Sequence, residues 1–597
     1  MKTTSDLPRL RSAWVPLLLT LSLSACGGGG GGGSDSGTTA GVGGTNTSPT
    51  PSAPPSTSHP PVAAPAVLAF PDTSRAFLTL PASVADNSTV SLECGRVYQG
   101  TLNLRNKSGV SVSTNGDCGP AVITPGQPVS GWTRHQGNIY SAPLSFDAAQ
   151  VVVDGQPVNK AHWPSRSQVW AQASSAGGSS LSYAMPNADL AGATLVFKPF
   201  EWAIEARRVT AYSGNTFTLA ATGNYAYDNY ALSGAVPFYV EGKLWMLDEP
   251  GEWAVSNGRL YLWVGDNGSP EGRTWAFPAS HGIEASDSRG VAINGVRIYG
   301  AANGIHAVGA QNLRVSNVEI ANASENGIVN HGGSGLNVDG ATIRNAKHDG
   351  ITVHWGGGNE VIQNSRIDTA GTVGMPSNSR SAINLTQSTG ARVSRNHVSN
   401  VGYIGIRVLT QGSVLDNTVD GACIVLTDCG GIFTFARDRQ VLNTRIEGNT
   451  VRNVGPTQRL AWGIYLSEYA NAVTVANNTV ANVGNGMNLF NAHNIAITGN
   501  RFSDARQAHI EITEDASSGT VRNISVNGNQ FTSIKGEENY RNSSNLGASS
   551  VAQFGTFDGN TYITNSSTFA NFQGQLLDFS QWKTRTGQDG SSTLRAP

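Results

Sequence analysis

The sequence predicts an all-β protein built as a parallel solenoid, with a small β domain inserted near its N-terminal end. The 71 glycines of the 597-residue chain, together with abundant Asn, Ser, Thr and Val, indicate short strands joined by tight turns. A Gly-Ile pair recurs at intervals of roughly 21 to 32 residues, and a line of asparagines follows the same period. Because each coil of such a repeat leans on its neighbours, a solenoid can exceed the size of one compact core.

Residues 1–26 are expected to be a lipoprotein signal peptide. A positively charged start precedes an apolar run over residues 13–23, which is shorter than the roughly 20 residues that a transmembrane helix requires. The run ends in Leu23-Ser24-Ala25-Cys26-Gly27, which resembles a bacterial lipobox, and this resemblance implies lipid on Cys26. Gly27 stands where inner-membrane retention usually shows Asp, so we expect an outer-membrane protein, with an ordinary secretory signal as the alternative.

The remaining chain divides by composition and periodicity. Residues 27–65 are rich in Gly, Ser, Thr and Pro and lack hydrophobic periodicity, which predicts a disordered tether. We then expect N-terminal coils over residues 66–167, an inserted β domain over 168–275, the main solenoid over 276–535 and a C-terminal cap over 536–597. The inserted domain lacks the repeat and is rich in aromatics, and Asp154-Gly155 ahead of it predicts a hairpin.

The charge and the cysteines of the chain indicate which partners, metals and cellular compartment to expect. The net charge is −2 and only 13% of residues are charged, so no basic stripe favours nucleic acid, and we expect a monomer. No spacing resembles a zinc site, so we expect no metal centre; no motif indicates a cofactor, and a calcium requirement stays open. Besides Cys26, four cysteines suit an oxidising compartment, as two possible disulfides: Cys94 with Cys118, one coil apart, and Cys423 with Cys429.

Two lines of residues define the repeat. The asparagine line is predicted to be a structural ladder that joins coils at their turns. It comprises Asn396, Asn417, Asn449, Asn478, Asn500 and Asn529. The Gly-Ile line is carried by Gly304, Gly327, Gly350, Ala382, Gly405, Gly431, Gly463, Gly486 and His509.

The strand that starts at each Gly-Ile pair provides a candidate saccharide-binding face. Because side chains alternate along a strand, the second and fourth residues after the glycine face outward. Aromatic rings, amides and acids on one face suit stacking against sugars and bonding to their hydroxyls. The candidate substrate-binding residues on or beside these positions are His354, Arg407, Phe433, Tyr465, Asn488, Glu511 and Glu514. For Glu511 and Glu514 the alternative is a solvated surface acid.

Three acids are candidates for glycoside hydrolysis, which needs two carboxyl groups. Glu468 is common to the pairs, and Asp438 lies roughly 8 Å from it by strand geometry. The alternative for Asp438 is a turn residue or a surface ion pair. Asp428 would lie roughly 26 Å from Glu468 along a straight strand. It joins the site only if the loop between Cys423 and Cys429 folds back, and otherwise caps its own turn.

Several motifs resemble those of right-handed parallel β-helix enzymes, over roughly residues 70–535. Trp132…Tyr140, Val153-Asp154-Gly155, Trp163-Pro164 and the segment from Leu247 to Trp263 are most similar to glycoside hydrolase families 120 and 141. Such proteins tend to carry Asp-x-Gly-(Gly/Ala)-Ile-Tyr, matched from Asp428 to Phe433, and Gly-Ile-Tyr-Leu-Asp-(Asp/Glu), matched from Gly463 to Glu468. The resemblance implies catalytic acids at Asp428 and near Glu468. Phe433 and Ser467 depart from the motifs, since Tyr and Asp are usual there.

The leading hypothesis is therefore a surface-anchored enzyme that hydrolyses glycosidic bonds of a polysaccharide or oligosaccharide. A polysaccharide lyase or uronate epimerase is the second possibility, because Arg407, His354 and Tyr465 supply a cation and candidate bases. A face without a Lys-Arg cluster suits neutral sugars better. A non-catalytic glycan-binding or adhesin lipoprotein is the third possibility.

Overall fold

The computed structural model describes residues 76–165, 170–221, 232–372, 381–436, 438–514, 521–542 and 554–597. These all belong to one compact unit that spans Ala66–Pro597. The predicted signal peptide, its Cys26 and the predicted tether lie outside the described residues. Within the described ranges, no helix is long and apolar enough to cross a membrane.

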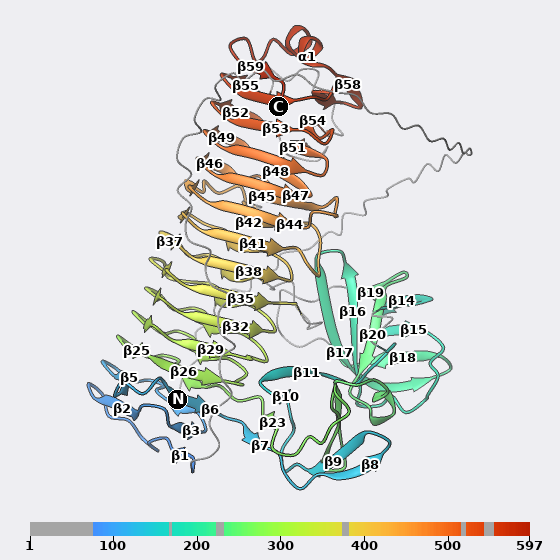
Figure 1. Ribbon diagram of the computed structural model, residues 1–597, viewed down its shortest axis with the longest axis vertical. Coiled ribbons are helices and arrows are strands. Elements are labelled where there is room, and N and C mark those ends of the chain that lie inside the picture. Colours follow the sequence, from blue (N-terminus) through green and yellow to red (C-terminus); the bar gives the residue numbers. More distant parts are fainter. Residues whose placement is uncertain are drawn as a thin grey trace, which may run out of the picture. The chain divides into compact units, whose positions relative to one another are not determined.

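The described residues form three long, mainly parallel sheets, whose strands stack coil upon coil in sequence order (Figure 1). Sheet A runs from β1 (Leu78–Thr79) to β59 (Thr593–Arg595), and sheet B runs from β2 (Thr89–Glu93) to β55 (Gly555–Asp558). Sheet C contains the Gly-Ile strands. Its strands are β4 (Leu102–Asn103), β24 (Ile283–Glu284), β27 (Ile305–His306), β30 (Ile328–Val329), β33 (Ile351–Val353), β36 (Ile383–Leu385), β39 (Ile406–Val408), β42 (Cys429–Phe435), β45 (Ala461–Ser467), β48 (Asn485–Phe490), β51 (Ala508–Thr513), β54 (Glu538–Asn542), β57 (Ala570–Phe572) and β58 (Gln575–Leu577).

The predicted asparagine ladder is confirmed at the turn between sheets B and A. Asn417 donates its backbone N–H to Asn449 Oδ1 at 2.9 Å, and Asn449 donates in the same way to Asn478 Oδ1 at 2.9 Å. The side-chain amide of each asparagine also donates to a carbonyl of the preceding coil, as from Asn449 Nδ2 to Val414 O at 2.9 Å. The ladder extends beyond the prediction to Asn560.

Close packing of coils explains why the Gly-Ile pair recurs. A Cβ on Gly327 would lie 2.4 Å from the carbonyl oxygen of Gly350 on the next coil, a separation that no side chain tolerates. The isoleucine that follows points into the interior, where Ile328, Ile351 and Ile464 are all fully buried. A small residue at the coil junction and a branched apolar residue in the core therefore define each repeat.

The inserted domain is larger than the sequence predicted. Solenoid strands stop at β6 (Ala121–Thr124) and resume at β24, and the chain between them forms two separate sheets, from β7 (Gln127–Pro128) to β23 (Thr274–Phe277). The predicted boundary at residue 168 is wrong, because residues 127–163 contain strands that pair within these sheets. The predicted hairpin is confirmed: Asp154 and Gly155, both with positive φ, join β10 (Gln150–Val153) to β11 (Gln156–Lys160).

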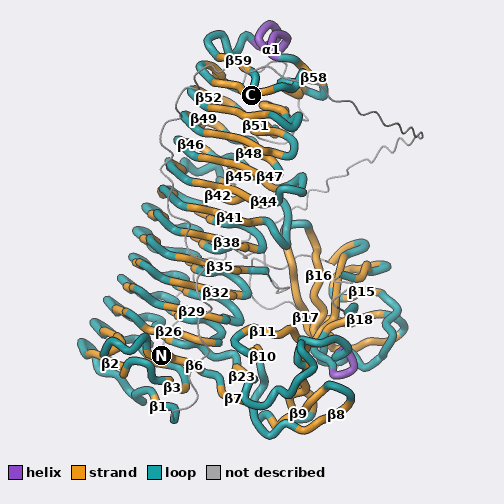
Figure 2. Tube along the Cα trace, in the orientation of Figure 1, coloured by secondary structure: helices purple, strands orange, loops and turns teal. Residues whose placement is uncertain are grey.

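The solenoid also continues past the predicted end at residue 535. Strands β54, β55, β56 (Thr561–Thr564), β57 and β59 add to the three sheets, so the cap is shorter than predicted. It contains α1 (Phe579–Thr586), the one α-helix of the described chain, drawn in purple in Figure 2. Trp582 of this helix stacks on Tyr540 with ring centroids 5.1 Å apart, which closes the apolar interior at the last coils.

A hairpin of the inserted domain contacts sheet C near the predicted catalytic loop. It consists of β16 (Thr194–Phe200) and β17 (Ala203–Ser213). Thr427 donates its N–H to Glu201 O at 3.1 Å, and Lys198 Nζ donates to Val425 O at 3.3 Å. The hairpin tip is thus bonded to the loop that carries Asp428.

Candidate active site

The register of sheet C aligns the predicted outward residues in one column. Each member is paired with the next across neighbouring strands. The column consists of Asn384, Arg407, Phe433, Tyr465, Asn488 and Glu511. These side chains point away from the solenoid interior, yet each is at most 9% exposed. The sequence placed them on a solvent face, whereas the structure covers them.

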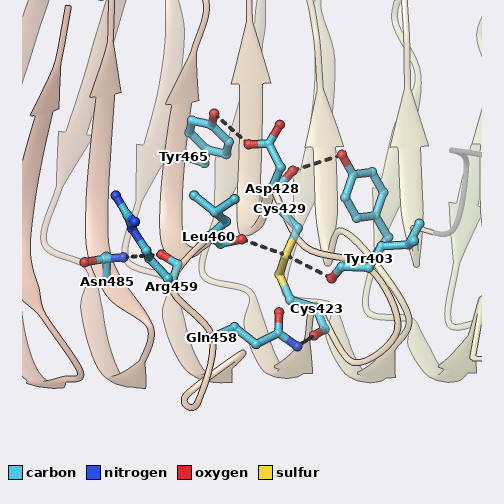
Figure 3. The surroundings of a disulfide bond; sticks show 10 residues. Tyr403, Cys423, Asp428, Cys429, Gln458, Arg459, Leu460, Tyr465 and Asn485 are labelled. Carbon is cyan, nitrogen blue, oxygen red and sulfur yellow. Dashed lines mark hydrogen bonds between the residues drawn. A yellow bond between two sulfur atoms is a disulfide. The ribbon is translucent and has the colours of Figure 1, made fainter. Parts of the chain in front are cut away.

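The disulfide loop ends beside Tyr465 of this column, and the Asp428 carboxylate points toward the Tyr465 hydroxyl (Figure 3). Cys423 and Cys429 form a disulfide with their Cα atoms 5.9 Å apart, and Asp428 adopts a positive φ of 53° directly before the second cysteine. The Asp428 N–H donates to Leu460 O at 2.7 Å, and Tyr403 OH donates to Asp428 O at 3.0 Å. Tyr465 OH donates to Asp428 Oδ1 at 3.0 Å. The Asp428 carboxylate thus reaches Tyr465 in the middle of the column, while the Asp428 backbone lies opposite Leu460, eight residues before Glu468. The predicted approach of Asp428 to Glu468 stays a prediction.

The segment ahead of β45 helps to hold this loop. Gln458 Nε2 donates to Cys423 O at 2.9 Å, and Asn485 Nδ2 donates to Arg459 O at 2.8 Å (Figure 3). Residues 456–461 directly precede Trp462 and follow β44 (Thr450–Val454). They connect the disulfide loop to the next coil.

Trp462 joins the site, although the sequence assigned it no role. Its ring lies 4.3 Å from that of Tyr465, and its Nε1 donates to Glu511 Oε2 at 2.8 Å. One aromatic pair is thus bonded to two acids: Tyr465 to Asp428, and Trp462 to Glu511. Burial, together with the charge of Asp428, raises the pKa of Tyr465 well above its usual value, so its hydroxyl remains a donor. The sequence feature that could have pointed to Trp462 is its position directly before Gly463, the glycine of a Gly-Ile pair.

Polar atoms of the column lack partners in the described chain. Arg407 lies over the rings of Tyr403 at 5.7 Å and Phe433 at 5.5 Å, and its Nε has no hydrogen-bond partner among the described residues. The same is true, within that part of the chain, of Asn384 Oδ1 and Asn488 Oδ1. Because buried polar atoms are normally paired, these positions suit water or a ligand with hydroxyl groups.

Asp349 is a second residue that sequence reasoning missed. It is 1% exposed and accepts from Ser381 N at 2.7 Å and from Asn384 Nδ2 at 2.9 Å. Burial raises its pKa, and the nearby Arg407 acts in the opposite direction. Its place directly before Gly350, equivalent to that of Trp462 before Gly463, was the available signal. Its hydrogen bond from Asn384 Nδ2 orients that amide in the column.

His354 lies beside the column rather than in it. Its Nδ1 is 2.7 Å from Thr386 Oγ1, and its ring meets that of His331 edge-on at 4.6 Å. Burial, together with the neighbouring charges of His331 and Arg407, lowers the pKa of His354 to about 3. The imidazole is therefore neutral in the folded protein.

The other predicted acids occupy different settings. Glu468 follows β45 and is half-buried, three residues from Tyr465 or roughly 10 Å along a strand. Asp438 is exposed in the turn after β42, which matches its alternative as a turn residue. Glu514 accepts from Val521 N at 3.0 Å and lies 3.6 Å from Arg522 NH1. The alternative of solvated surface acids is wrong for Glu511 and Glu514, because they are only 9% and 4% exposed.

Comparisons with known proteins agree on the fold. A family model described as right handed beta helix region matches residues 281–451 and 381–561. A solved glycoside hydrolase shares 12% identity, covers 72% of this chain and 88% of its own, and has a TM-score of 0.51. The chain is a right-handed parallel β-helix.

Other β-helix structures are more distant. A tailspike protein mutant of an E. coli bacteriophage, in complex with a pentasaccharide, shares 13% identity over 49% of this chain and 68% of its own, with a TM-score of 0.34. The catalytic domain of an alpha-1,3-glucanase in complex with tetrasaccharides shares 9% identity over 78% and 91%, with a TM-score of 0.29. No curated protein sequence matches this β-helix.

Proposed function

We propose that this β-helix hydrolyses glycosidic bonds of a polysaccharide or oligosaccharide, with Asp428 and Glu511 as its two carboxyl groups. The observation that carries the proposal is that both acids are bonded to the same aromatic pair, Tyr465 and Trp462. An aromatic surface between two acids is what a sugar ring needs for stacking and for proton transfer at its glycosidic oxygen.

The two acids take different roles. Asp428 accepts a hydrogen bond from Tyr465, whose raised pKa keeps it protonated, and this favours the ionised carboxylate of a base or nucleophile. Glu511 can accept from Trp462 on one oxygen and carry the leaving-group proton on the other. Tyr465 and Glu511 stand two coils apart, roughly 10 Å at strand spacing.

Glu468 is the alternative partner of Asp428, as the family resemblance implied. It lies at the end of β45, on the same strand as Trp462 and Tyr465. We favour Glu511 because its carboxylate is bonded directly to the aromatic pair. Asp438 has no such support, since it is exposed in a turn.

The column provides the contacts for a glycan. Its six residues span five coil intervals, roughly 24 Å at strand spacing, which is room for several sugar units. The unpaired atoms of Asn384, Arg407 and Asn488 suit sugar hydroxyls. Because these atoms are themselves buried, a glycan reaches them only when a local change of conformation exposes the column.

Secretion and anchoring belong to the same proposal. The signal segment, the lipobox-like residues around Cys26 and the predicted tether support an enzyme held at the outer membrane by lipid. The two disulfides suit an oxidising compartment. We propose that the enzyme works there as a monomer.

A lyase or epimerase is the second candidate, and Arg407 is the observation that favours it. Its guanidinium lies over Phe433, which neighbours Tyr465 in the column, and it could neutralise a uronate carboxylate while a tyrosine moves the proton.

A glycan panel separates these functions. Hydrolysis predicts new reducing ends without ultraviolet absorbance, whereas elimination also produces an absorbing double bond. Asp428→Asn should abolish turnover and Asp438→Asn, a matched exposed acid, should not. Turnover that survives Asp428→Asn would overturn the site assignment, and binding without turnover by the wild type would establish a binding protein.

A further inference from the structure

A second cluster of reactive side chains lies on sheet C where the chain returns from the inserted domain. Strands β24 and β27 are adjacent and pair Glu284 with His306. His306 Nδ1 is 2.9 Å from Glu284 Oε2, and His281 Nε2 is 4.0 Å from the same oxygen. The two imidazole rings lie parallel, with centroids 4.1 Å apart. Two imidazoles and a carboxylate therefore converge on one point.

A hydrogen bond accounts for only one of these two distances to Glu284. The 2.9 Å contact is a hydrogen bond, but 4.0 Å between His281 Nε2 and Glu284 Oε2 is too long for one. Two ligands of one tetrahedral ion, each about 2.0–2.2 Å from it, lie roughly 3.3–3.6 Å apart. The two observed distances bracket that value. One ligand atom from each of the three residues lies within 4.8 Å of the others, close enough for a small shift to place all three around one ion.

Surrounding groups orient the cluster. Glu284 Oε1 accepts from Ser286 N at 2.8 Å, which leaves Oε2 directed at the imidazoles. On the far side of His281, Asn303 Nδ2 lies 3.3 Å from Nδ1 and also donates to Glu325 Oε2 at 2.7 Å. A metal-binding histidine donates its outer ring N–H to an acceptor. Because Asn303 Nδ2 is a donor, binding of an ion by His281 Nε2 also requires His281 Nδ1–H to pair with Asn303 Oδ1 or Glu325 instead. The side chains of His281, Glu284 and His306 remain 30%, 12% and 22% exposed, so an ion can reach them.

One neighbour competes with a cation. Arg105 NH2 lies 3.4 Å from Glu284 Oε1, and its side chain is 49% exposed. It also pairs with Asp287 at 3.4 Å. An exposed arginine with a second acidic partner can leave Glu284 at little cost.

We propose that His281, Glu284 and His306 bind a divalent transition-metal ion of the Zn²⁺ type, which clamps the junction where the chain re-enters the β-helix. Nitrogen ligands with one carboxylate suit Zn²⁺, whereas Ca²⁺ and Mg²⁺ prefer oxygen alone. The ion would add a side-chain link to the backbone hydrogen bonds that already join these two coils, such as Ile283 N to Gly304 O at 3.0 Å and Ala285 N to His306 O at 2.7 Å.

This site is independent of the proposed catalytic acids. His306 occupies the register position of sheet C that is equivalent to Tyr465, but the two stand six coil intervals apart, roughly 29 Å at strand spacing. An ion at His306 therefore does not touch Asp428, and failure of one proposal leaves the other intact. The site could not be recognised from the sequence, because Glu284 follows His281 by three residues while His306 lies 22 residues later, on the next coil.

Equilibrium dialysis of the full chain, stripped with chelator and titrated with Zn²⁺, tests the proposal. We expect one tightly bound Zn²⁺ per chain, no comparable binding of Mg²⁺ or Ca²⁺, and a thermal midpoint that rises with Zn²⁺ concentration. His306→Ala and Glu284→Gln should weaken binding at least 10-fold. His397→Ala, a partly buried histidine on sheet A outside the cluster, should bind as the wild type does.

Arg105→Ala provides a test that removes no ligand. Freed from its competing cation, Glu284 should bind Zn²⁺ several-fold more tightly, which is an effect that a damaged fold does not produce. The proposal is overturned if the wild type binds no more Zn²⁺ than His306→Ala does. It is also overturned if Mg²⁺ raises the thermal midpoint as much as Zn²⁺.

Discussion

Two lines of side chains run along this β-helix, and they behave in opposite ways. The asparagine ladder repeats one residue type on seven coils, from Asn396 to Asn560, and each member is at most 2% exposed and bonded to its neighbours. The outward column of sheet C carries different residues on most of its coils, including aromatics, an arginine, amides and an acid. Several of its polar atoms have no partner within the described residues.

This difference indicates which residues of a solenoid are candidates for function. A residue that repeats with every coil satisfies its own bonds and stabilises the architecture, because each coil presents the same need. A column that varies from coil to coil and leaves buried polar atoms unpaired is not optimised for stability. We therefore expect substitutions in the column to reduce activity and substitutions in the ladder to reduce stability.

The largest effect is expected at the centre of the column. Asp428→Asn should lower kcat/KM by roughly 10³-fold, or about 4 kcal/mol in the barrier, because an amide cannot serve as base or nucleophile. The hydrogen bond from Tyr465 can persist, so the thermal midpoint should change little. Kinetics and calorimetry on one preparation measure both. A variant that loses stability but keeps its turnover would show that Asp428, like the ladder asparagines, has a structural role.

The ladder should respond in the opposite sense. Asn449→Ala leaves the Asn417 N–H without its partner and removes a hydrogen bond to the Val414 carbonyl, which should cost about 2–4 kcal/mol in the free energy of unfolding. Urea denaturation gives this value. Asn337→Ala, at an exposed position in β31 (Asn337–Asp339), is the control and should change it by less than about 0.5 kcal/mol. Equal losses of unfolding free energy in the two variants would show that a ladder asparagine contributes no more to stability than an exposed one.

The second acid is tested by paired substitutions. Glu511→Gln should lower kcat roughly 10²-fold, or about 2.7 kcal/mol, while the Trp462 hydrogen bond can persist to the new amide oxygen. Glu468→Gln should have a smaller effect. The opposite order would identify Glu468 as the partner of Asp428, as the family resemblance implied.

The two disulfides allow a crossed comparison. Cys94 and Cys118 link adjacent coils across 24 residues, and Cys423 and Cys429 close a loop of six. Loop entropy predicts losses of about 3 and about 2 kcal/mol, respectively, when each pair is replaced by serine. Only the second replacement should also reduce turnover, since it releases Asp428. Loss of turnover in the Cys94 and Cys118 variant at a temperature where it is folded would contradict this.

The smallest effect concerns pH. Burial lowers the pKa of His331 to about 4 and that of His354 to about 3, both below the ordinary value of 6.5. The unfolded chain therefore binds protons first, and stability that is present above pH 6.5 is lost as pH falls towards these values. His354→Gln should reduce the loss between pH 6.5 and 5.5 by about 1 kcal/mol. Denaturation curves at the two pH values measure it, and an unchanged difference would show that His354 is already protonated.

The sequence could predict the features that depend on the period. The solenoid, the asparagine ladder and the alignment of Arg407, Phe433, Tyr465 and Asn488 all follow from one repeat, because neighbouring coils obey the same register. The domain boundaries failed for the complementary reason. Strands at residues 127–163 resemble solenoid strands in composition, and their choice of partner in the inserted domain depends on contacts far along the chain.

The sequence by itself determined which coils carry acids and aromatics, because strand alternation and the Gly-Ile spacing place every side chain in a column. Only the tertiary structure decided which of them meet. The fold of the Cys423–Cys429 loop brought Asp428 to Tyr465, the Trp462 ring reached across to Glu511 two coils away, and the return of the chain from the inserted domain set His281 beside His306. Loop conformation and side-chain reach between coils are not periodic, and no repeat in the sequence records them.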